Sequence, residues 1–223
     1  MSTSQSTIER LSSHVITLAT VIALGLLVEA RVRPQRATGA ALRVERLDNW
    51  DSLKRGALVS LGELGRPVEI TVFTDFQCPF CRVMDSVLTV LDERFPGKLS
   101  RGIVHYPLPS HPHAIGAAVA FECAASVTGA LNVHRALYAR QATLGSMPWH
   151  EVALPVNADT SNFGRCVAGQ PNPRIQQGSQ LAQRLKLSGT PAVVVNGWLF
   201  DPGLPGPVSE AVERAVNGKS PKP

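Results

Sequence analysis

The chain has few aromatic and few charged residues: aromatics make up 5% and Asp, Glu, Lys and Arg together 17% of its 223 residues. The net charge of +5 is small, and no basic stripe is interleaved with aromatic rings. A nucleic-acid surface needs clustered positive charge and rings on which bases can stack. We therefore expect no nucleic-acid partner. The apolar fraction of 44% is enough for a core, so the chain as a whole does not read as disordered.

Long apolar runs are also scarce, and the one near the N-terminus covers only residues 15–28. A bilayer needs roughly 20 residues, a length that is reached only over residues 11–30. Residues 1–30 are therefore a signal anchor or a signal peptide, and we favour the anchor because no small-residue cleavage motif follows. A buried core helix is a third reading, which the Arg- and Pro-rich linker predicted at 31–48 disfavours. The basic residues after the run would by themselves keep the domain in the cytoplasm.

Strand and helix patterns alternate along the rest of the chain. Strands are predicted at 68–74, 99–106 and 192–196, the last one turning at Asn196-Gly197 and returning through 198–200. Helices are predicted after Cys81 as far as about Pro96, and over 111–141, 173–187 and 207–216.

Cysteines are few as well, and two of the four stand in the motif Cys78-Pro79-Phe80-Cys81. The motif follows a predicted strand and opens a predicted helix, so Cys78 would lie at a helix N-terminus. The free N–H groups and the helix dipole there stabilise a thiolate and lower its pKa. We therefore predict that Cys78 and Cys81 are a redox pair, with Cys78 as the reactive thiol and Cys81 as the resolving thiol.

A structural disulfide and half of a metal site are the competing interpretations of a C-x-x-C. Zinc would need two more ligands, and the spacing of His105, His111 and His113 matches no common zinc pattern. The sequence contains no flavin or nucleotide motif either. We therefore expect neither a metal nor another cofactor.

A second motif places Pro191 at the start of a strand that otherwise reads as central, in Ser-Gly-Thr-Pro-Ala-Val-Val-Val-Asn-Gly. A cis bond before this proline would account for its position. Together, DFQCPFC and SGTPAVVVNG resemble the thioredoxin superfamily, and most of all its DsbA-like branch. The resemblance implies that the Thr190–Pro191 bond is cis, lies beside the C-x-x-C and pairs with an extended substrate chain.

The resemblance covers about residues 60–217 and implies an α/β thioredoxin fold. In this fold a central mixed sheet is flanked by helices, and a helical insertion separates the βαβ and ββα halves. We place the thioredoxin-like domain at 49–218, the insertion at about 107–186 and a frayed tail at 219–223. The start of the insertion, His-Pro-His-Ala at 111–114, resembles many bacterial members.

The sequence departs from the family pattern at two places. Phe80 replaces the histidine of the strongest oxidants, which removes a cationic or donor group, and we expect it to bind substrate on an apolar rim with Pro79. Thioredoxin-type proteins often carry a buried acid six residues before the first cysteine, where this chain has Val72. Asp75 is a possible helper in proton transfer, although we expect it at an exposed strand end in a turn or cap role. Rim and core are equally good readings for Phe76.

The other two cysteines, Cys123 and Cys166, lie within the insertion. An even count in an exported protein is typical of paired cysteines, so we predict a structural disulfide between them. Two buried free thiols are the alternative.

The predicted function is thiol-disulfide exchange, introducing or exchanging disulfides in exported, cysteine-containing proteins. This chemistry places the domain outside the cytoplasm, in the periplasm or cell envelope, tethered to the inner membrane by residues 11–30. The resemblance further implies a quinone-linked membrane oxidase as redox partner. A reductase or isomerase, a peptide-binding module with a structural C-x-x-C and a metal-delivery protein are the alternatives.

Overall fold

The computed structural model describes residues 41–155, 160–169 and 172–222, and within them six strands form one mixed sheet. The strands are β1 (Arg43–Arg46), β2 (Leu58–Ser60), β3 (Val68–Thr74), β4 (Leu99–His105), β5 (Ala192–Val195) and β6 (Trp198–Asp201). Their order across the sheet is β1-β6-β5-β3-β4-β2. Strands β3 and β4 run parallel, and the other neighbours are antiparallel. This sheet is the one expected of a thioredoxin fold.

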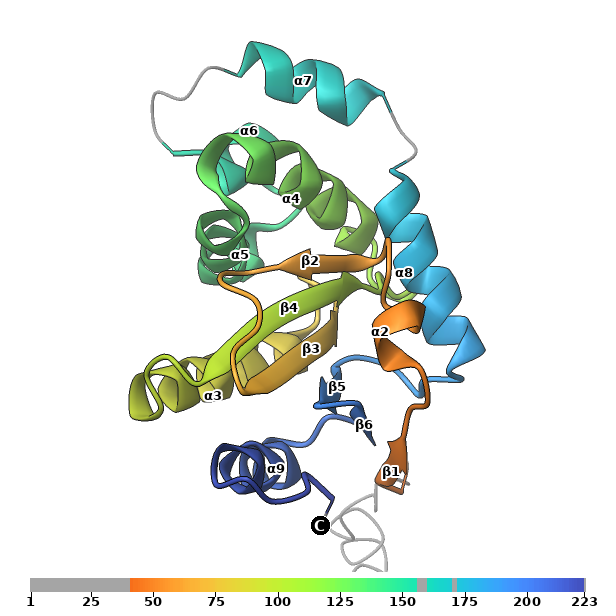
Figure 1. Cartoon of the computed structure of the whole chain (residues 1–223). Helices are drawn as coiled ribbons and strands as arrows, with labels where there is room; N and C mark the ends of the chain where they lie inside the picture. Colours follow the sequence, from red (N-terminus) through yellow and green to blue (C-terminus); the bar gives the residue numbers. More distant parts are fainter. Residues whose placement is uncertain (1–40, 156–159, 170–171, 223) are drawn as a thin grey trace, which may run out of the picture. The chain divides into compact units, whose positions relative to one another are not determined.

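Eight α-helices precede, separate or follow these strands along the described residues, and Figure 1 shows them beside the sheet. They are α2 (Trp50–Leu53), α3 (Pro79–Arg94), α4 (Ala114–Thr128), α5 (Ala130–Ala139), α6 (Trp149–Ala153), α7 (Ser161–Ala168), α8 (Pro173–Arg184) and α9 (Pro205–Val216), with a 3₁₀ turn at Gln141–Thr143. Helices α4 to α8 stand between β4 and β5, which is the predicted insertion.

The strands bury alternate residues on opposite faces of the sheet, as their period of two requires. On one face Val72 and Val193 belong to an apolar cluster with residues of α3 and α9 such as Leu88. On the other face Phe73 and Val194 belong to a cluster with residues of α2 and α8, among them Trp50, Leu181 and Ala182. The central strands are therefore covered on both sides, which explains why they read as continuous apolar runs.

Helix α3 buries Cys81, Met84, Leu88 and Leu91, which recur at intervals of three and four residues and form one helical stripe. Cys78 is its N-cap residue in extended conformation, and Pro79 occupies the first helical position, where no N–H donor is needed. The apolar stripe and the proline together hold the C-x-x-C at the start of the helix.

The turn from β5 to β6 has the two-residue form predicted from Asn196-Gly197. Both residues have positive φ, 45° and 79°, which suits the right-handed twist of a hairpin. The Asn196 side chain also accepts a hydrogen bond from the backbone N–H of Glu69 at 2.7 Å, so the turn is fastened to β3.

The folded domain begins earlier than the predicted boundary at 49. Strand β1 lies inside the segment 31–48 that we interpreted as linker, and it pairs with β6 at the sheet edge. Three of its four residues, Arg-Val-Glu-Arg, are charged. This composition is typical of a linker, so the sequence did not predict the edge strand. Arg43 fixes it by an ion pair to the buried Asp201 carboxylate at 3.1 Å.

Two further expectations need correction. The Ala-rich segment 111–141 is not one helical stretch, because Gly129, with φ of 83°, separates α4 from α5. The C-terminal residues 219–222 are not frayed: Pro221 is buried, and Lys222 Nζ lies 5.8 Å from the centroid of the Trp198 ring.

The predicted signal anchor at 1–30 lies outside the described residues. Among the residues that the structure does describe, we find no helix with the length and apolar character needed to cross a membrane.

Helices α4 to α7 share an apolar cluster that is cross-linked by a disulfide between Cys123 of α4 and Cys166 of α7. Both cysteines belong to the insertion, and the bond closes a loop over a sequence separation of 43 residues. The other two cysteines are free thiols.

We expect the double substitution Cys123→Ser/Cys166→Ser to lower the free energy of unfolding by about 4 kcal/mol, because the unfolded chain regains the entropy of an open loop. Urea unfolding measures the change. Ser126→Ala, an exposed substitution on the same helix, is the matched control and should change it by less than about 0.5 kcal/mol. A loss below about 1 kcal/mol in the double variant would contradict a stabilising disulfide.

Candidate active site

The two free cysteines, Cys78 and Cys81, lie at the end of α3 that follows strand β3. Their exposed fractions are 3% and 1%. The backbone N–H of Cys78 donates to the carbonyl of Asp75 at 3.0 Å, which closes the turn between strand and helix. The structure thus puts Cys78 at the helix N-terminus, as the sequence predicted, with Cys81 one turn further on.

The proline motif lies directly beside Cys78. The Thr190–Pro191 bond is cis, and the Cys78 thiol donates to the Thr190 carbonyl with an Sγ–O distance of 3.4 Å. Strands β3 and β5 create this proximity, because they are antiparallel and Phe73 is paired with Ala192. The end of β3 therefore meets the start of β5, and the two motifs are joined across 112 positions of sequence.

The two thiols have opposite acidities. The pKa of Cys78 falls from its ordinary value of 9.0 to about 6, chiefly because the Cys81 thiol donates to its sulfur. Thr190 and the backbone N–H groups of Phe80 and Cys81 also lower this pKa, while burial opposes the shift. Burial raises the pKa of Cys81 well above 9.0, and the neighbouring Cys78 adds to the rise. At neutral pH the pair therefore holds one thiolate on Cys78 and one proton on Cys81.

Asp75 is buried, which corrects the expectation of an exposed strand end. Its Oδ1 accepts from the backbone N–H of Gln77 at 2.7 Å, which is the expected turn role. Its Oδ2 accepts from the N–H of Leu108 at 2.9 Å and lies 2.7 Å from Nδ1 of His111. The carboxylate thus fastens the segment before α4 to the turn that precedes Cys78. These contacts position the turn, and the role of Asp75 as a helper in proton transfer stays a prediction.

Gln141, which sequence reasoning missed, holds the same turn from the other side. Its Nε2 donates to the carbonyls of Phe76 and Cys78 at 2.8 and 2.9 Å. Nothing in the local sequence marks this glutamine, since its partners are backbone atoms more than 60 positions away. The His-Pro-His segment marks His111 as a residue of interest, but the sequence does not indicate that its partner is Asp75.

The two phenylalanines near the motif have different roles. Phe80 is 70% exposed and is available at the rim, as predicted. Phe76 is buried and stacks on Phe121 with ring centroids 5.3 Å apart, so its rim reading is wrong.

The three histidines considered as zinc ligands have separate partners. His105 contacts Glu122 and His111 contacts Asp75. The backbone N–H of His113 donates to Oε1 of Gln77 at 2.7 Å. In the part of the chain that the structure describes, no three His, Cys, Asp or Glu side chains are grouped so as to hold a metal ion.

A mixed sheet that carries a C-x-x-C at a helix N-terminus, beside a cis-proline, defines the class of thioredoxin-fold dithiol proteins. The comparison with protein families agrees with this class: the family model described as Thioredoxin matches residues 54–214. The chain therefore belongs to the thioredoxin family.

Relatives with curated names fall into two groups. The Na(+)/H(+) antiporter NhaA 1 of Mycobacterium sp. (strain KMS) is 28% identical over 140 residues, which cover 61% of this chain and 23% of the antiporter. The chain thus spans less than a quarter of that relative's length. The probable disulfide bond formation protein D of Bacillus anthracis is 26% identical over 155 residues, covering 64% of this chain and 71% of that protein.

Among solved structures, a thioredoxin-like oxidoreductase from Silicibacter pomeroyi DSS-3 is similar, with a TM-score of 0.58 and 25% identity. The similarity covers 76% of this chain and 99% of that one.

The pKa of Cys78 gives a direct test of the site. In the reduced protein, the ultraviolet absorbance of its thiolate should appear with a midpoint at about pH 6. Cys81→Ala removes the donor to the Cys78 sulfur, so the midpoint should move towards 9.0, whereas Cys81→Ser keeps a hydroxyl donor and should shift it less. An unchanged midpoint in Cys81→Ala would contradict the assignment of the donor.

The same shift links stability to pH. The folded pKa of Cys78 lies below the unfolded value of about 8.5, so the reduced protein gains stability that is fully present above about pH 8.5. This gain is lost as the pH falls through about 6. The free energy of unfolding of the reduced protein, relative to the oxidised one, should therefore decrease from about pH 8.5 to 6 in urea titrations.

Proposed function

We propose that the chain is a thiol-disulfide oxidoreductase that introduces or exchanges disulfides in exported proteins through Cys78 and Cys81. The observation that carries the proposal is the split in acidity between the two thiols, with the pKa of Cys78 at about 6 and that of Cys81 well above 9.0. A structural disulfide needs no such difference. The similarity to the probable disulfide bond formation protein D supports the same reaction class.

The reaction begins with the oxidised pair. A substrate thiolate attacks the Cys78 sulfur, the Cys78–Cys81 bond breaks, and Cys81 leaves as a thiolate that takes up a proton. A second substrate thiolate then attacks the substrate sulfur of the mixed disulfide and displaces Cys78. Because the pKa of Cys78 is low, it is a good leaving group, and the reduced enzyme is stabilised relative to the oxidised one. Both effects favour donation of the disulfide.

Substrate docking is proposed for the surface beside Cys78. Thr190 places its backbone against the Cys78 sulfur, and Pro191 directly precedes strand β5. An extended substrate chain that pairs with the backbone at Thr190 would bring its own cysteine to Cys78. Phe80, which is exposed next to the motif, offers an apolar contact for the substrate.

The cellular setting belongs to the proposal as well. Disulfide donation needs an oxidising compartment, and the disulfide between Cys123 and Cys166 is consistent with one. We place the domain in the periplasm or cell envelope, with residues 11–30 as its anchor in the inner membrane. After donating its disulfide the dithiol must be reoxidised, and a quinone-linked membrane oxidase is the proposed partner.

The decisive experiment mixes the oxidised protein with a reduced, unfolded cysteine-containing protein and follows the loss of substrate thiols. We expect rapid transfer, no transfer by Cys78→Ser, and a reduction potential of the pair near the oxidising end, about −120 mV, in glutathione buffers. A potential near about −270 mV would favour a reductase. A pair that does not exchange, with a potential far below about −300 mV, would overturn the proposal in favour of a structural C-x-x-C.

A further inference from the structure

Cys81 has to exchange a proton in every catalytic cycle, yet it is buried and its pKa is raised. At the position six residues before Cys78 stands the apolar Val72. Asp75 directs its carboxylate to backbone groups and to His111. Other polar groups that adjoin Cys81 are therefore candidates to exchange its proton.

A small internal cavity adjoins Cys81. Its volume of about 10 Å³ is close to what one water molecule needs. Its polar lining comes from β3, α3, β4 and α5, through Thr74, Asp85, Arg101, His134 and Tyr138. Asp85 follows Cys81 by four residues, so the carboxylate and the thiol lie on the same face of α3.

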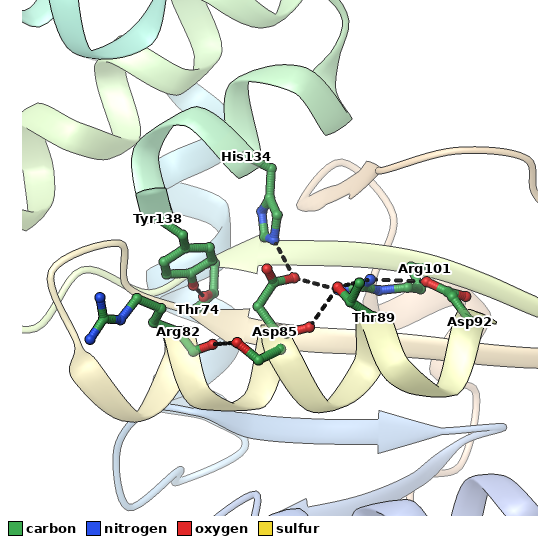
Figure 2. A network of polar contacts seen from close by, with 9 residues as sticks. Thr74, Arg82, Asp85, Thr89, Asp92, Arg101, His134 and Tyr138 are labelled. Atoms are coloured by element: carbon green, nitrogen blue, oxygen red, sulfur yellow. Dashed lines mark hydrogen bonds and ion pairs between the residues drawn. The ribbon is translucent and has the colours of Figure 1, made fainter. Parts of the chain in front are cut away.

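Asp85 and His134 form the one His–carboxylate pair among the described residues that line this cavity. Nε2 of His134 lies 2.9 Å from Oδ1 of Asp85, and Figure 2 shows the imidazole directed at the carboxylate from α5. The Arg101 guanidinium, from β4, donates to the same oxygen. Arg101 also binds Asp92 at 2.9 Å, so the carboxylate is held by a cation that is itself fixed.

The contact with Asp85 leaves the second nitrogen of His134 as an acceptor. A carboxylate at Nε2 favours the tautomer that carries its hydrogen there. Within the described residues, Nδ1 is buried and has no hydrogen-bond partner. His134 is only 3% exposed, and burial lowers its pKa, so it is neutral and able to accept a proton at neutral pH.

We propose that the Asp85–His134 pair accepts the proton of Cys81, through the shared cavity, when Cys81 attacks a mixed disulfide on Cys78. This inference rests on the proposed function. His134 takes the proton from the Cys81 thiol, and the Cys81 thiolate attacks the Cys78 sulfur. The Cys78–Cys81 bond forms, the bond from Cys78 to the substrate sulfur breaks, and the substrate leaves as a thiolate. In this step Cys81 is oxidised, the substrate sulfur is reduced and Cys78 remains in a disulfide, so no further oxidant is needed.

The proton then has a route to solvent. The Asp85 side chain is 18% exposed, while His134 is buried, so the carboxylate connects the cavity with the surface. In the opposite direction, disulfide donation, the same pair would return a proton to the Cys81 thiolate.

Several charged or titratable groups face this pair from the elements around it. On β4 they are Arg101 and His105, on α5 Tyr138, and on α3 Cys81 itself, with Asp92 beyond Arg101. Tyr138 shares a hydrogen bond with Thr74, its pKa is raised well above 10.0 chiefly by burial, and it stays protonated. It therefore contributes a hydroxyl to the cavity and no charge.

The structure supplies a matched control, because a second carboxylate, Glu122, also contacts one histidine and one arginine. His105 lies 3.0 Å from Glu122, which also binds Arg174 at 2.9 Å. His105 is as deeply buried as His134, and Nδ1 of both lacks a partner among the described residues. None of these three residues lines the cavity beside Cys81.

The test follows one turnover of the full chain. Reduced protein is mixed with dithiobis-nitrobenzoate, which forms a mixed disulfide on Cys78. The attack of Cys81 then releases a second, coloured nitrobenzoate thiolate, and this second phase is measured from about pH 5 to 9 in parent, Asp85→Asn, His134→Gln and the control Glu122→Gln. Far- and near-ultraviolet circular dichroism checks the fold of each variant.

We expect the second phase to slow by at least about tenfold near pH 7 in Asp85→Asn and His134→Gln, and to become proportional to hydroxide concentration. Glu122→Gln should stay within about twofold of the parent. The direction of the rate change in Asp85→Asn distinguishes a proton acceptor from a purely electrostatic effect. If Asp85 acted only through its negative charge, its removal would lower the pKa of the Cys81 thiol and accelerate the attack. A faster or unchanged second phase in Asp85→Asn, or an equal slowing in Glu122→Gln, would overturn the inference.

This measurement needs no protein substrate. A protein that fails to oxidise unfolded substrates but shows the expected second phase would refute the proposed function and keep the proton acceptor. The opposite result is also possible: the protein oxidises substrates, and Asp85→Asn and His134→Gln leave the pH profile unchanged. That result would support the proposed function and refute the proton acceptor.

Discussion

The antiparallel pairing of β5 with β3 is the constraint on which the candidate site depends. It aligns Phe73 with Ala192, so the turn that leads into Cys78 and the turn that contains Thr190 meet at the same end of these two central strands. The contact between the two motifs is the one from the Cys78 thiol to the Thr190 carbonyl. The apolar clusters on both faces of the sheet hold this register, since a slip by one residue would turn every buried side chain to the wrong face.

The helical insertion separates the two motifs in sequence and is tied to the site by polar contacts. His111 reaches Asp75, His134 reaches Asp85, and Gln141 reaches the carbonyl of Cys78. Buried polar groups are costly unless they are paired, so each contact specifies where the insertion lies on the thioredoxin core. The disulfide between Cys123 and Cys166 acts at a distance from these contacts and joins helices within the insertion.

The proposed chemistry follows from the different surroundings of two identical side chains. Cys78 lies at the end of α3, where N–H groups and the Cys81 thiol can donate to a thiolate. Cys81 lies one turn deeper, where burial disfavours charge and where a small polar cavity adjoins it. A donor disulfide needs this asymmetry. One sulfur must be a good leaving group, and the other must gain or lose a proton out of contact with bulk water.

The sequence by itself determined the elements that local patterns encode. The apolar run at 68–74 predicted β3 with its observed ends, Pro79 predicted the start of α3 around the C-x-x-C, and Asn196-Gly197 predicted the hairpin. The sequence did not predict strand β1, because an edge strand tolerates charged residues and this one has no apolar pattern. The position of Asp75 and the roles of Gln141 and His134 depended on tertiary structure alone. Their partners are backbone atoms or side chains far along the chain, and hydrogen bonds of that kind leave no periodic signal in sequence.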